Sequence, residues 1–402
     1  GWGTVKIQIS TDAAHAVWTD LATGEAVGGG AGSSPPYAGT GDYTANIPIS
    51  AVGTTVKVRV VSETDGTVLA TSANNFTVLA KVALDTPSAA GISMNVDDPY
   101  LITWTLSGSG VTNVKLEYST AGPTGPWTEI VASTSATNVD STHGSYSWSV
   151  ANITGTGRYI KVSDVSIPTI SDVSDNGFEV RGQFTGFLPN GGEVYDYGSS
   201  VPITWVWHGS GAATADVLFS SDGATFPPAN VICNDVLASD PSCDWHLGVT
   251  PTGTNYKVRV EQTSNPSTVN AQSAATFRIK GVLTVTSPAG GETWFVGDTD
   301  KTISWTKSPA ALGNTKLEYS TNGGSSWNTI VASQAGTSYP WNPITGAGLP
   351  DAAVMIRASV ASDPTIFDDA AATIRIRGKL VLTAPTTIGI AWEVGTTQSI
   401  TW

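Results

Sequence analysis

The sequence predicts an all-β protein built from tandem β-sandwich repeats. Three observations predict this fold: a Trp-containing strand recurs about every hundred residues, each copy holds short segments of alternating polar and apolar residues, and no long helix-period segment interrupts them. The composition agrees, because the chain is rich in Gly and β-branched residues and only 13% of its 402 residues are charged.

The Trp-containing strand is the clearest repeating element. It reads Ile-Thr-Trp three times and Ile-Ser-Trp once, and successive copies are 101, 100 and 97 residues apart. About 100 residues is the size of one immunoglobulin-like or fibronectin-III-like sandwich, so we expect such sandwiches in a linear array. In the first three copies the Trp is expected to pack between two sheets. These residues are Trp104, Trp205, Trp305 and, in the last copy, Trp402.

The strands that follow keep the same phase along the chain. An alternating segment recurs at residues 6–11, 115–120, 216–221 and 316–321, as is typical of a half-exposed strand. A turn and an aromatic residue come next, and further strands close each repeat. This pattern gives about seven strands per repeat, and no helix is expected.

The repeat sets the predicted domain boundaries. Complete sandwiches are expected at residues 81–181, 182–280 and 281–378, a sandwich without its first two strands at 1–80, and only those first two strands at 379–402. Two interpretations of the ends compete. Either the chain is a segment of a longer array, or its last strand pair completes the first sandwich of another copy, as in donor-strand complementation.

The junctions between repeats are short. The last strand of one repeat runs into the first strand of the next with one or two residues between them, as at Gly281 and Gly378. No Gly/Ser-rich or Pro-rich spacer separates the repeats. We therefore expect little freedom at the junctions and a stiff array.

A motif in the last complete repeat resembles that of a known family. Residues 287–297 read Ser-Pro-Ala-Gly-Gly-Glu-Thr-Trp-Phe-Val-Gly and precede Thr-Ile-Ser-Trp at 302–305 and Lys-Leu-Glu-Tyr-Ser at 316–320. This resembles the module of the Ser/Thr-rich, glycolipid-anchored yeast cell-wall family, which also occurs in tandem in large bacterial surface proteins. Residues 188–195 match it well and 384–395 more loosely.

The resemblance implies an immunoglobulin-like fold and an extracellular setting, and it brings no catalytic residues. The second repeat departs from the motif, since it keeps only Thr-Pro-Ser at 86–88. Long acidic arrays of this kind also resemble bacterial surface-layer proteins.

Charge and motif content narrow the function classes. The net charge of −14 opposes binding to nucleic acid and to anionic lipid. No nucleotide-binding loop, zinc-protease motif or nucleophile elbow occurs, so we expect a protein without enzymatic activity. No apolar run is long enough to insert this segment into a membrane.

Two cysteines, Cys233 and Cys243, lie close together in a Pro/Asp/Ser-rich segment. We predict a local disulfide and, with it, an oxidising compartment. The alternatives are two free thiols or a zinc site that includes His208 and His246.

Acidic residues in predicted loops are candidate calcium ligands, because calcium is bound by clustered carboxylate and carbonyl oxygens. The alternative is that they are solvated turn residues, since none matches a defined calcium loop. No other cofactor is expected. The candidates are Asp97, Asp98, Asp298 and Asp300.

Four further residues are candidates for carrying or contacting sugars at the surface. Asn75 and Asn152 stand in Asn-X-Thr sequons and are candidate glycosylation sites of a glycoprotein. Trp127 and Trp327 follow turns and are candidate glycan contacts, with a place in the core as the alternative.

These observations favour a non-enzymatic extracellular structural protein at the cell surface: a stiff repeat rod of a surface layer or an extracellular filament. Its expected partners are copies of itself or neighbouring domains of a longer chain, and cell-surface glycans. The alternatives are an adhesin or carbohydrate-binding array, or accessory modules of a larger secreted enzyme.

Overall fold

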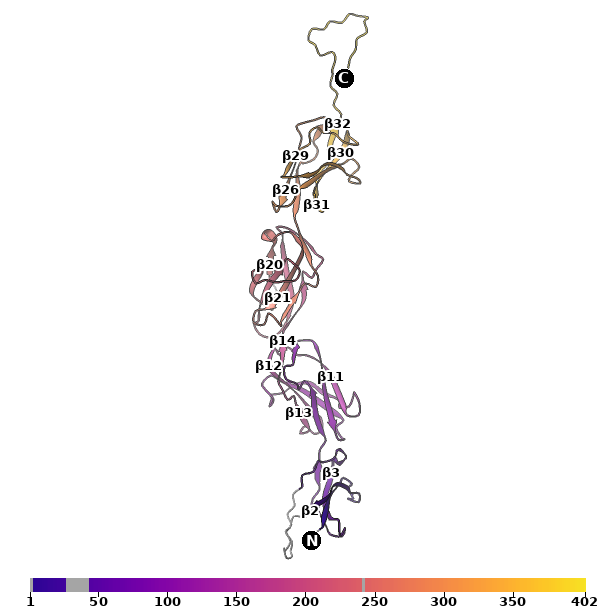
Figure 1. Ribbon diagram of the computed structural model, residues 1–402, viewed down its shortest axis with the longest axis vertical. Coiled ribbons are helices and arrows are strands. Elements are labelled where there is room, and N and C mark those ends of the chain that lie inside the picture. The colour runs from indigo at the N-terminus through magenta and orange to yellow at the C-terminus, as the bar shows by residue number, and fades with distance from the viewer. Residues whose placement is uncertain (1–2, 27–42, 241–242) are drawn as a thin grey trace. The chain divides into compact units, whose positions relative to one another are not determined.

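The computed structural model describes residues 3–26, 43–240 and 243–402 (Figure 1). These residues form strands β1–β32 and two short 3₁₀-helices, η1 (Ile49–Ala51) and η2 (Leu247–Val249), with no α-helix among them. The predicted all-β fold is therefore confirmed. The chain divides into two compact units, residues 1–183 with 207–211 and residues 184–206 with 212–402.

The first unit begins with a five-stranded antiparallel sheet, here called the first sheet. Its order is β2-β1-β3-β4, and β5 also pairs with β3. Residues 27–42 of the sandwich predicted at 1–80 lie outside the described residues, and the described part of that range holds no second sheet. The strands are β1 (Thr4–Ser10), β2 (Thr19–Ala26), β3 (Gly53–Ser62), β4 (Leu69–Thr71) and β5 (Phe76–Val78).

A complete sandwich follows in the first unit. A six-stranded sheet in the order β10-β9-β12-β14-β7, with β13 on β12, faces a three-stranded sheet in the order β11-β8-β6. Apolar side chains of both sheets form one core around Trp104. The strands are β6 (Lys81–Thr86), β7 (Ser93–Asn95), β8 (Pro99–Ser107), β9 (Asn113–Ser119), β10 (Thr128–Ser135), β11 (His143–Ser149), β12 (Gly155–Asp164), β13 (Ser171–Val173) and β14 (Phe178–Arg181).

The next sandwich, the third in chain order, has sheets β15-β17-β20 and β16-β23-β21-β18-β19, with β22 on β21. Most of it belongs to the second unit, while Gln183 of β15 and the end of β17 group with the first. The strands are β15 (Gln183–Leu188), β16 (Val194–Asp196), β17 (Ser200–His208), β18 (Thr214–Ser220), β19 (Val231–Leu237), β20 (Cys243–His246), β21 (Gly253–Gln262), β22 (Asn270–Gln272) and β23 (Phe277–Lys280).

The fourth sandwich lies entirely in the second unit. Its sheets are β24-β26-β29 and β25-β32-β30-β27-β28, with β31 on β30, and they enclose a core around Trp305. The strands are β24 (Val282–Ser287), β25 (Thr293–Phe295), β26 (Thr302–Ser308), β27 (Thr315–Ser320), β28 (Asn328–Gln334), β29 (Ser338–Pro340), β30 (Asp351–Val360), β31 (Asp363–Asp369) and β32 (Ile374–Arg377).

The sheets repeat one another in order and in register. The large sheets of the three sandwiches have the same strand order, and the first sheet has the same central part. One residue pair at the centre of each large sheet identifies equivalent positions along the chain. These pairs are Ile7–Val60, Leu116–Val162, Val217–Val260 and Leu317–Ala358.

The three predicted core Trp residues, Trp104, Trp205 and Trp305, are buried. The expected number of strands per repeat was too low, because each complete sandwich has a six-stranded and a three-stranded sheet. The additional strands are short: β7 and β13 have three residues each. Such short segments carry too few residues to show an alternating pattern.

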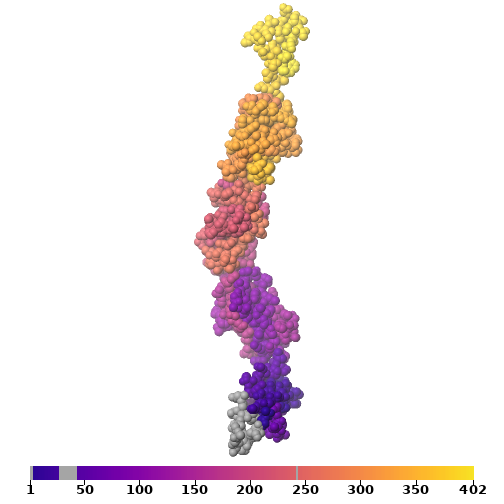
Figure 2. Space-filling view, in the orientation of Figure 1, coloured from indigo at the N-terminus to yellow at the C-terminus, as the bar shows by residue number. Residues whose placement is uncertain are grey.

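The two strands predicted in residues 379–402 do not form. This segment has one isolated β-bridge, between Ala384 and Thr401, and an open chain elsewhere, drawn in yellow in Figures 1 and 2. Strands need a neighbouring sheet to bury one face, and that residues 379–402 belong to a further sandwich stays a prediction.

Candidate functional site

The connections between consecutive sandwiches are as short as the sequence predicts. One residue separates β14 from β15 and β23 from β24, and two residues separate β5 from β6. Chain segments this short leave few backbone dihedrals free. The junctions within each unit are therefore the parts of this fold that bear on the predicted stiffness of the array.

In the first unit, the residues at the junction beside β6 are in close van der Waals contact. A Cβ atom on Gly108 would lie 2.6 Å from Cγ2 of Val52 and 3.3 Å from Cα of Ala80. Ala80 is buried and belongs to the core of the second sandwich, and Val52 packs against that core. The segment before β3 thus contributes an apolar contact to the sandwich that follows it.

In the second unit, a charged contact joins the third and fourth sandwiches. Arg278 of β23 forms an ion pair with Asp363 of β31 and donates a 2.8 Å hydrogen bond to Oγ1 of Thr365. The Thr365 hydroxyl and then Arg278 hold the pKa of Asp363 below its ordinary value, since both stabilise the carboxylate. A Cβ on Gly281 would meet Leu312 Cδ1 at 2.4 Å. This junction therefore combines close packing with a specific ion pair.

A basic side chain covers the aromatic residue that follows each turn. The guanidinium carbon of Arg357 lies 4.0 Å from the ring centroid of Trp327, and Nζ of Lys161 lies 5.7 Å from that of Trp127. Cation–π attraction and contact of the aliphatic stem stabilise such pairs. The same relation joins Arg59 to Trp18 at 4.2 Å and Arg259 to Phe226 at 5.6 Å.

These stacks bear on the two glycan-contact candidates. Trp127 and Trp327 are both half-buried, and the basic side chain accounts for one ring face without any ligand. The sequence contains a signal for this pairing, because a Lys or Arg recurs at the same phase in the equivalent strands β3, β12, β21 and β30. That glycans bind these residues stays a prediction.

The Gly-Gly-Glu motif has a local structural role. The carboxylate of Glu292 accepts hydrogen bonds from the backbone N–H groups of Ala289 and Gly290, at 2.8 and 2.7 Å. Glu193 binds Asn190 and Gly191 in the same way, at 2.8 Å each. The motif thus fixes the turn before the short strands β16 and β25, and we assign it no chemistry.

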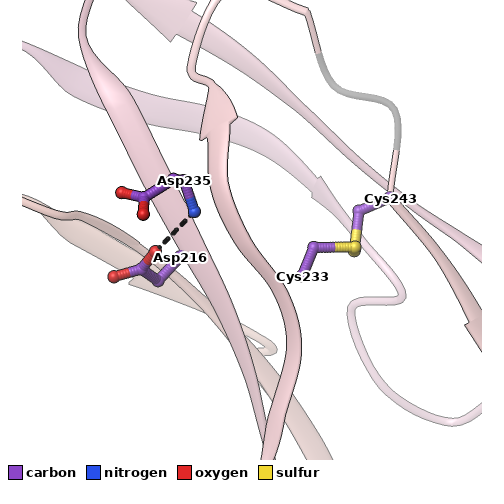
Figure 3. Close-up of a disulfide and its surroundings, with 4 residues drawn as sticks. All are labelled: Asp216, Cys233, Asp235 and Cys243. Carbon is purple, nitrogen blue, oxygen red and sulfur yellow. Dashed lines mark hydrogen bonds between the residues drawn. A yellow bond between two sulfur atoms is a disulfide. The ribbon is translucent and has the colours of Figure 1, made fainter.

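The structure joins Cys233 and Cys243 by a disulfide with a Cα–Cα distance of 6.0 Å (Figure 3). Cys233 lies on β19, at the edge of the six-stranded sheet, and Cys243 lies on β20, at the edge of the three-stranded sheet. The bond therefore links the two sheets of the third sandwich. The described residues contain no free cysteine.

Each of the four calcium candidates contacts another protein group, and calcium binding by them stays a prediction. Asp97 contacts Nδ1 of His208 at 2.6 Å, and Asp98 accepts a hydrogen bond from Asn95. Asp298 accepts the backbone N–H of Phe295, and Asp300 contacts the ammonium group of Lys301. Among residues 3–26, 43–240 and 243–402, no three His, Cys, Asp or Glu side chains gather so that they could hold a metal ion.

The sequons lie in accessible positions, since Asn75 and Asn152 are both exposed. Their glycosylation stays a prediction. No helix in the described part of the chain is long and apolar enough to span a bilayer.

Comparison with known proteins gives no family. No protein-family model matches the sequence, and no curated protein matches it. The predicted relationships to the yeast cell-wall module and to surface-layer proteins therefore stay predictions.

Solved structures with tandem immunoglobulin domains are similar to the chain at 9–11% identity. Sidekick-1 immunoglobulin domains 1–5 cover 82% of this chain, with 68% of their own length matched, at a TM-score of 0.23. Drosophila OTK extracellular domains 3–5 cover 75%, with 98% of their length matched, at 0.30. The N-terminal four Ig domains of Dscam1 isoform 4.4 cover 93%, with 92% matched, at 0.24.

TM-scores this low carry no argument about function. The paired six-stranded and three-stranded sheets themselves show that the chain consists of tandem immunoglobulin-like modules.

Proposed function

We propose that this chain is a non-enzymatic extracellular structural protein, a stiff repeat element of a surface layer or extracellular filament. The observation that carries the proposal is the direct junction between modules, with one or two residues between strands and packed contacts on either side. A structural protein that holds two surfaces at a fixed distance needs such short junctions, whereas a flexible tether needs long Gly/Ser-rich linkers. Residues 81–181, 182–280 and 281–378 are the domain boundaries that we propose.

Two further features support the extracellular part of the proposal. The Cys233–Cys243 disulfide is of a kind that persists in oxidising compartments. The net charge of −14 keeps a protein soluble and opposes its binding to nucleic acid.

Immunogold electron microscopy on cells that produce the protein tests its location and role together. We expect label on an ordered layer or on filaments outside the cell. Label confined to the cell interior would overturn the extracellular proposal.

Small-angle scattering tests stiffness separately. Replacing Gly281 by a flexible Gly/Ser segment should broaden the distribution of molecular dimensions relative to the unmodified chain. An unmodified chain that is already as broad as the variant would contradict the stiff junction.

A further inference from the structure

The core of the fourth sandwich differs from the other two complete sandwiches in one hydrogen bond. In the second sandwich Nε1 of Trp104 donates to the carbonyl oxygen of Ala136, and in the third Nε1 of Trp205 donates to that of Ala238. Nε1 of Trp305 is buried and has no hydrogen-bond partner among the described residues. A buried N–H group without an acceptor is costly, so this position favours a bound acceptor.

A short connection explains why the backbone does not supply this acceptor. Residues 136–142 connect β10 to β11 in the second sandwich, and Ala136 at their start is 0% exposed. Only residues 335–337 connect β28 to β29 in the fourth sandwich, and Ala335 and Gly336 are exposed. The chain therefore turns outward where the equivalent segment of the second sandwich enters the core.

The residue that supplies the acceptor elsewhere is held by a second hydrogen bond. The backbone N–H of Ala136 donates to the carbonyl oxygen of Thr112 at 3.0 Å, and that of Ala238 donates to Ala213 at 2.9 Å. By the register of the large sheets, the equivalent of Thr112 and Ala213 in the fourth sandwich is Gly313. The carbonyl oxygen of Gly313 has a different donor.

This donor is Lys307, whose Nζ binds the Gly313 oxygen at 2.8 Å. Lys307 stands at a core position, because it pairs with Leu283 as the buried Leu106 pairs with Val82 in the second sandwich. Burial lowers the pKa of Lys307 below its ordinary value. The ammonium group thus replaces the backbone N–H of the residue whose carbonyl oxygen is missing, and it lies beside the place of that oxygen.

A third polar group faces the same end of this core. Thr315 is 0% exposed, and its Oγ1 has no hydrogen-bond partner among the described residues. The equivalent residues, Val114 and Ala215, are apolar core residues. Thr315 begins β27 two residues after Gly313, so it lies close to the carbonyl group that binds Lys307.

These groups suit a small anion. The indole N–H and the ammonium group donate hydrogen bonds and have no acceptor capacity. The ion pairs of the described residues do not include Lys307. An anion would accept from these donors and balance the charge of Lys307, whereas a water molecule would leave that charge unbalanced.

We propose that the fourth sandwich binds a small monovalent anion, of the class of chloride, between Trp305 Nε1, Lys307 Nζ and Thr315 Oγ1. The anion takes the place that the carbonyl oxygen of Ala136 has in the second sandwich. The site is formed by one module, and it does not depend on the proposed structural role.

Hydrogen exchange in sodium chloride and in sodium gluconate at equal ionic strength tests the site. The amides of β26 and β27 should exchange about tenfold more slowly in about 0.15 M chloride, which corresponds to a Kd of about 0.02 M. The amides of β8 and β9 are the internal control. They should exchange equally in both salts, because Trp104 has a backbone acceptor.

Two substitutions remove donors of the site. Lys307→Leu introduces the residue type that the second sandwich has at this position, and it should abolish the difference between the salts. Thr315→Val is milder and should reduce the difference to about threefold. Lys316→Leu is the matched control and should keep the full difference, because Lys316 forms an ion pair with Glu318 outside the core.

Equal exchange of the β26 and β27 amides in the two salts would overturn the proposal. A chloride effect that is the same in the second sandwich, or that persists in Lys307→Leu, would do so too. If Lys307→Leu did not fold, an undiminished chloride effect in Thr315→Val would reject the site.

Chloride should also raise the cost of Trp305→Phe and leave that of Trp104→Phe unchanged, because only Trp305 would bind the anion. The contacts that the protein itself makes with the two Trp residues are therefore compared in gluconate.

Discussion

The indole Nε1 of Trp104 donates a 2.9 Å hydrogen bond to the carbonyl oxygen of Ala136 inside the core of the second sandwich. Trp205 makes the equivalent bond to Ala238 at 2.8 Å. Trp305, at the same position of the fourth sandwich, has a buried Nε1 with no hydrogen-bond partner among the described residues. The equivalent Trp residues therefore differ in their polar environment: the indole N–H is hydrogen-bonded in the second and third sandwiches and unpaired in the fourth.

The hydrogen bond between Trp104 and Ala136 has room to form because Gly144 has no side chain. A Cβ at this position would lie 2.4 Å from both Trp104 Nε1 and the Ala136 oxygen. We predict that Gly144→Ala destabilises the second sandwich by about 1–3 kcal/mol, because an overpacked core must shift ring or backbone. Hydrogen exchange of the amides of β8 and β11 measures the loss. Gly66→Ala is the control, since nothing lies within 4 Å of its Cβ; equal effects of the two changes would refute the prediction.

The same comparison predicts unequal costs for Trp→Phe substitutions. At Trp104 the change removes a made hydrogen bond and leaves the Ala136 oxygen without this donor, whereas at Trp305 it removes a donor that is already unpaired. We expect Trp104→Phe to destabilise its sandwich by about 1 kcal/mol more than Trp305→Phe does. Module-resolved hydrogen exchange can compare the two, and a larger cost at Trp305 would contradict the assignment.

The sequence predicts the repeated part of this fold because the repeat is local. Trp104, Trp205 and Trp305 occupy the core, and the strands around them follow from alternation and turns. The stack of Arg357 on Trp327 was not predicted, because it joins a strand, β30, to the residue before β28, and the sequence leaves the register between these segments open.

The two ends show a second limit. Ile400 and Trp402 have the pattern of a strand, but in the described residues their segment forms one isolated β-bridge and no strand, because an alternating pattern alone does not supply the pairing that a strand needs. Calcium binding by the acidic candidates stays a prediction, and the sequence does not show one contact that bears on it: His208, 111 residues away in the chain, lies 2.6 Å from Asp97. The contacts that decide a site lie across the fold.

Reduction of the Cys233–Cys243 disulfide should loosen the third sandwich. The bond closes a loop with a sequence separation of 10 and joins the edges of two sheets. A loop of this size is worth about 2–3 kcal/mol through the entropy of the unfolded chain. The backbone N–H of Asp235 also binds Asp216 at 2.9 Å, so β19 should stay on β18 after reduction (Figure 3).

Calorimetry with and without a thiol reductant measures this effect. One transition should move to lower temperature while the others stay unchanged. The double variant Cys233→Ser/Cys243→Ser is the control, and it should unfold early in both conditions. A reductant-induced shift that persists in this variant would place the effect elsewhere.

The ion pair of Arg278 and Asp363 should make the stability of the third and fourth sandwiches depend on pH. The folded-state pKa of Asp363 is lowered from 3.8, so its contribution is present above that ordinary value and disappears as the pH falls through the folded pKa. Asp363→Asn should therefore be less stable than the unmodified chain near neutrality, and the two should converge in acid. Both side chains are partly exposed, so we expect a difference of no more than about 1 kcal/mol.

Urea unfolding of the two proteins at a series of pH values tests this convergence. Thr365→Val provides the matched control, because the Thr365 hydroxyl is the largest cause that lowers the Asp363 pKa. Without this hydroxyl the contribution of Asp363 should disappear at a higher pH. A stability difference that grows in acid, or that is the same at every pH, would mean that the carboxylate does not stabilise this junction through its charge.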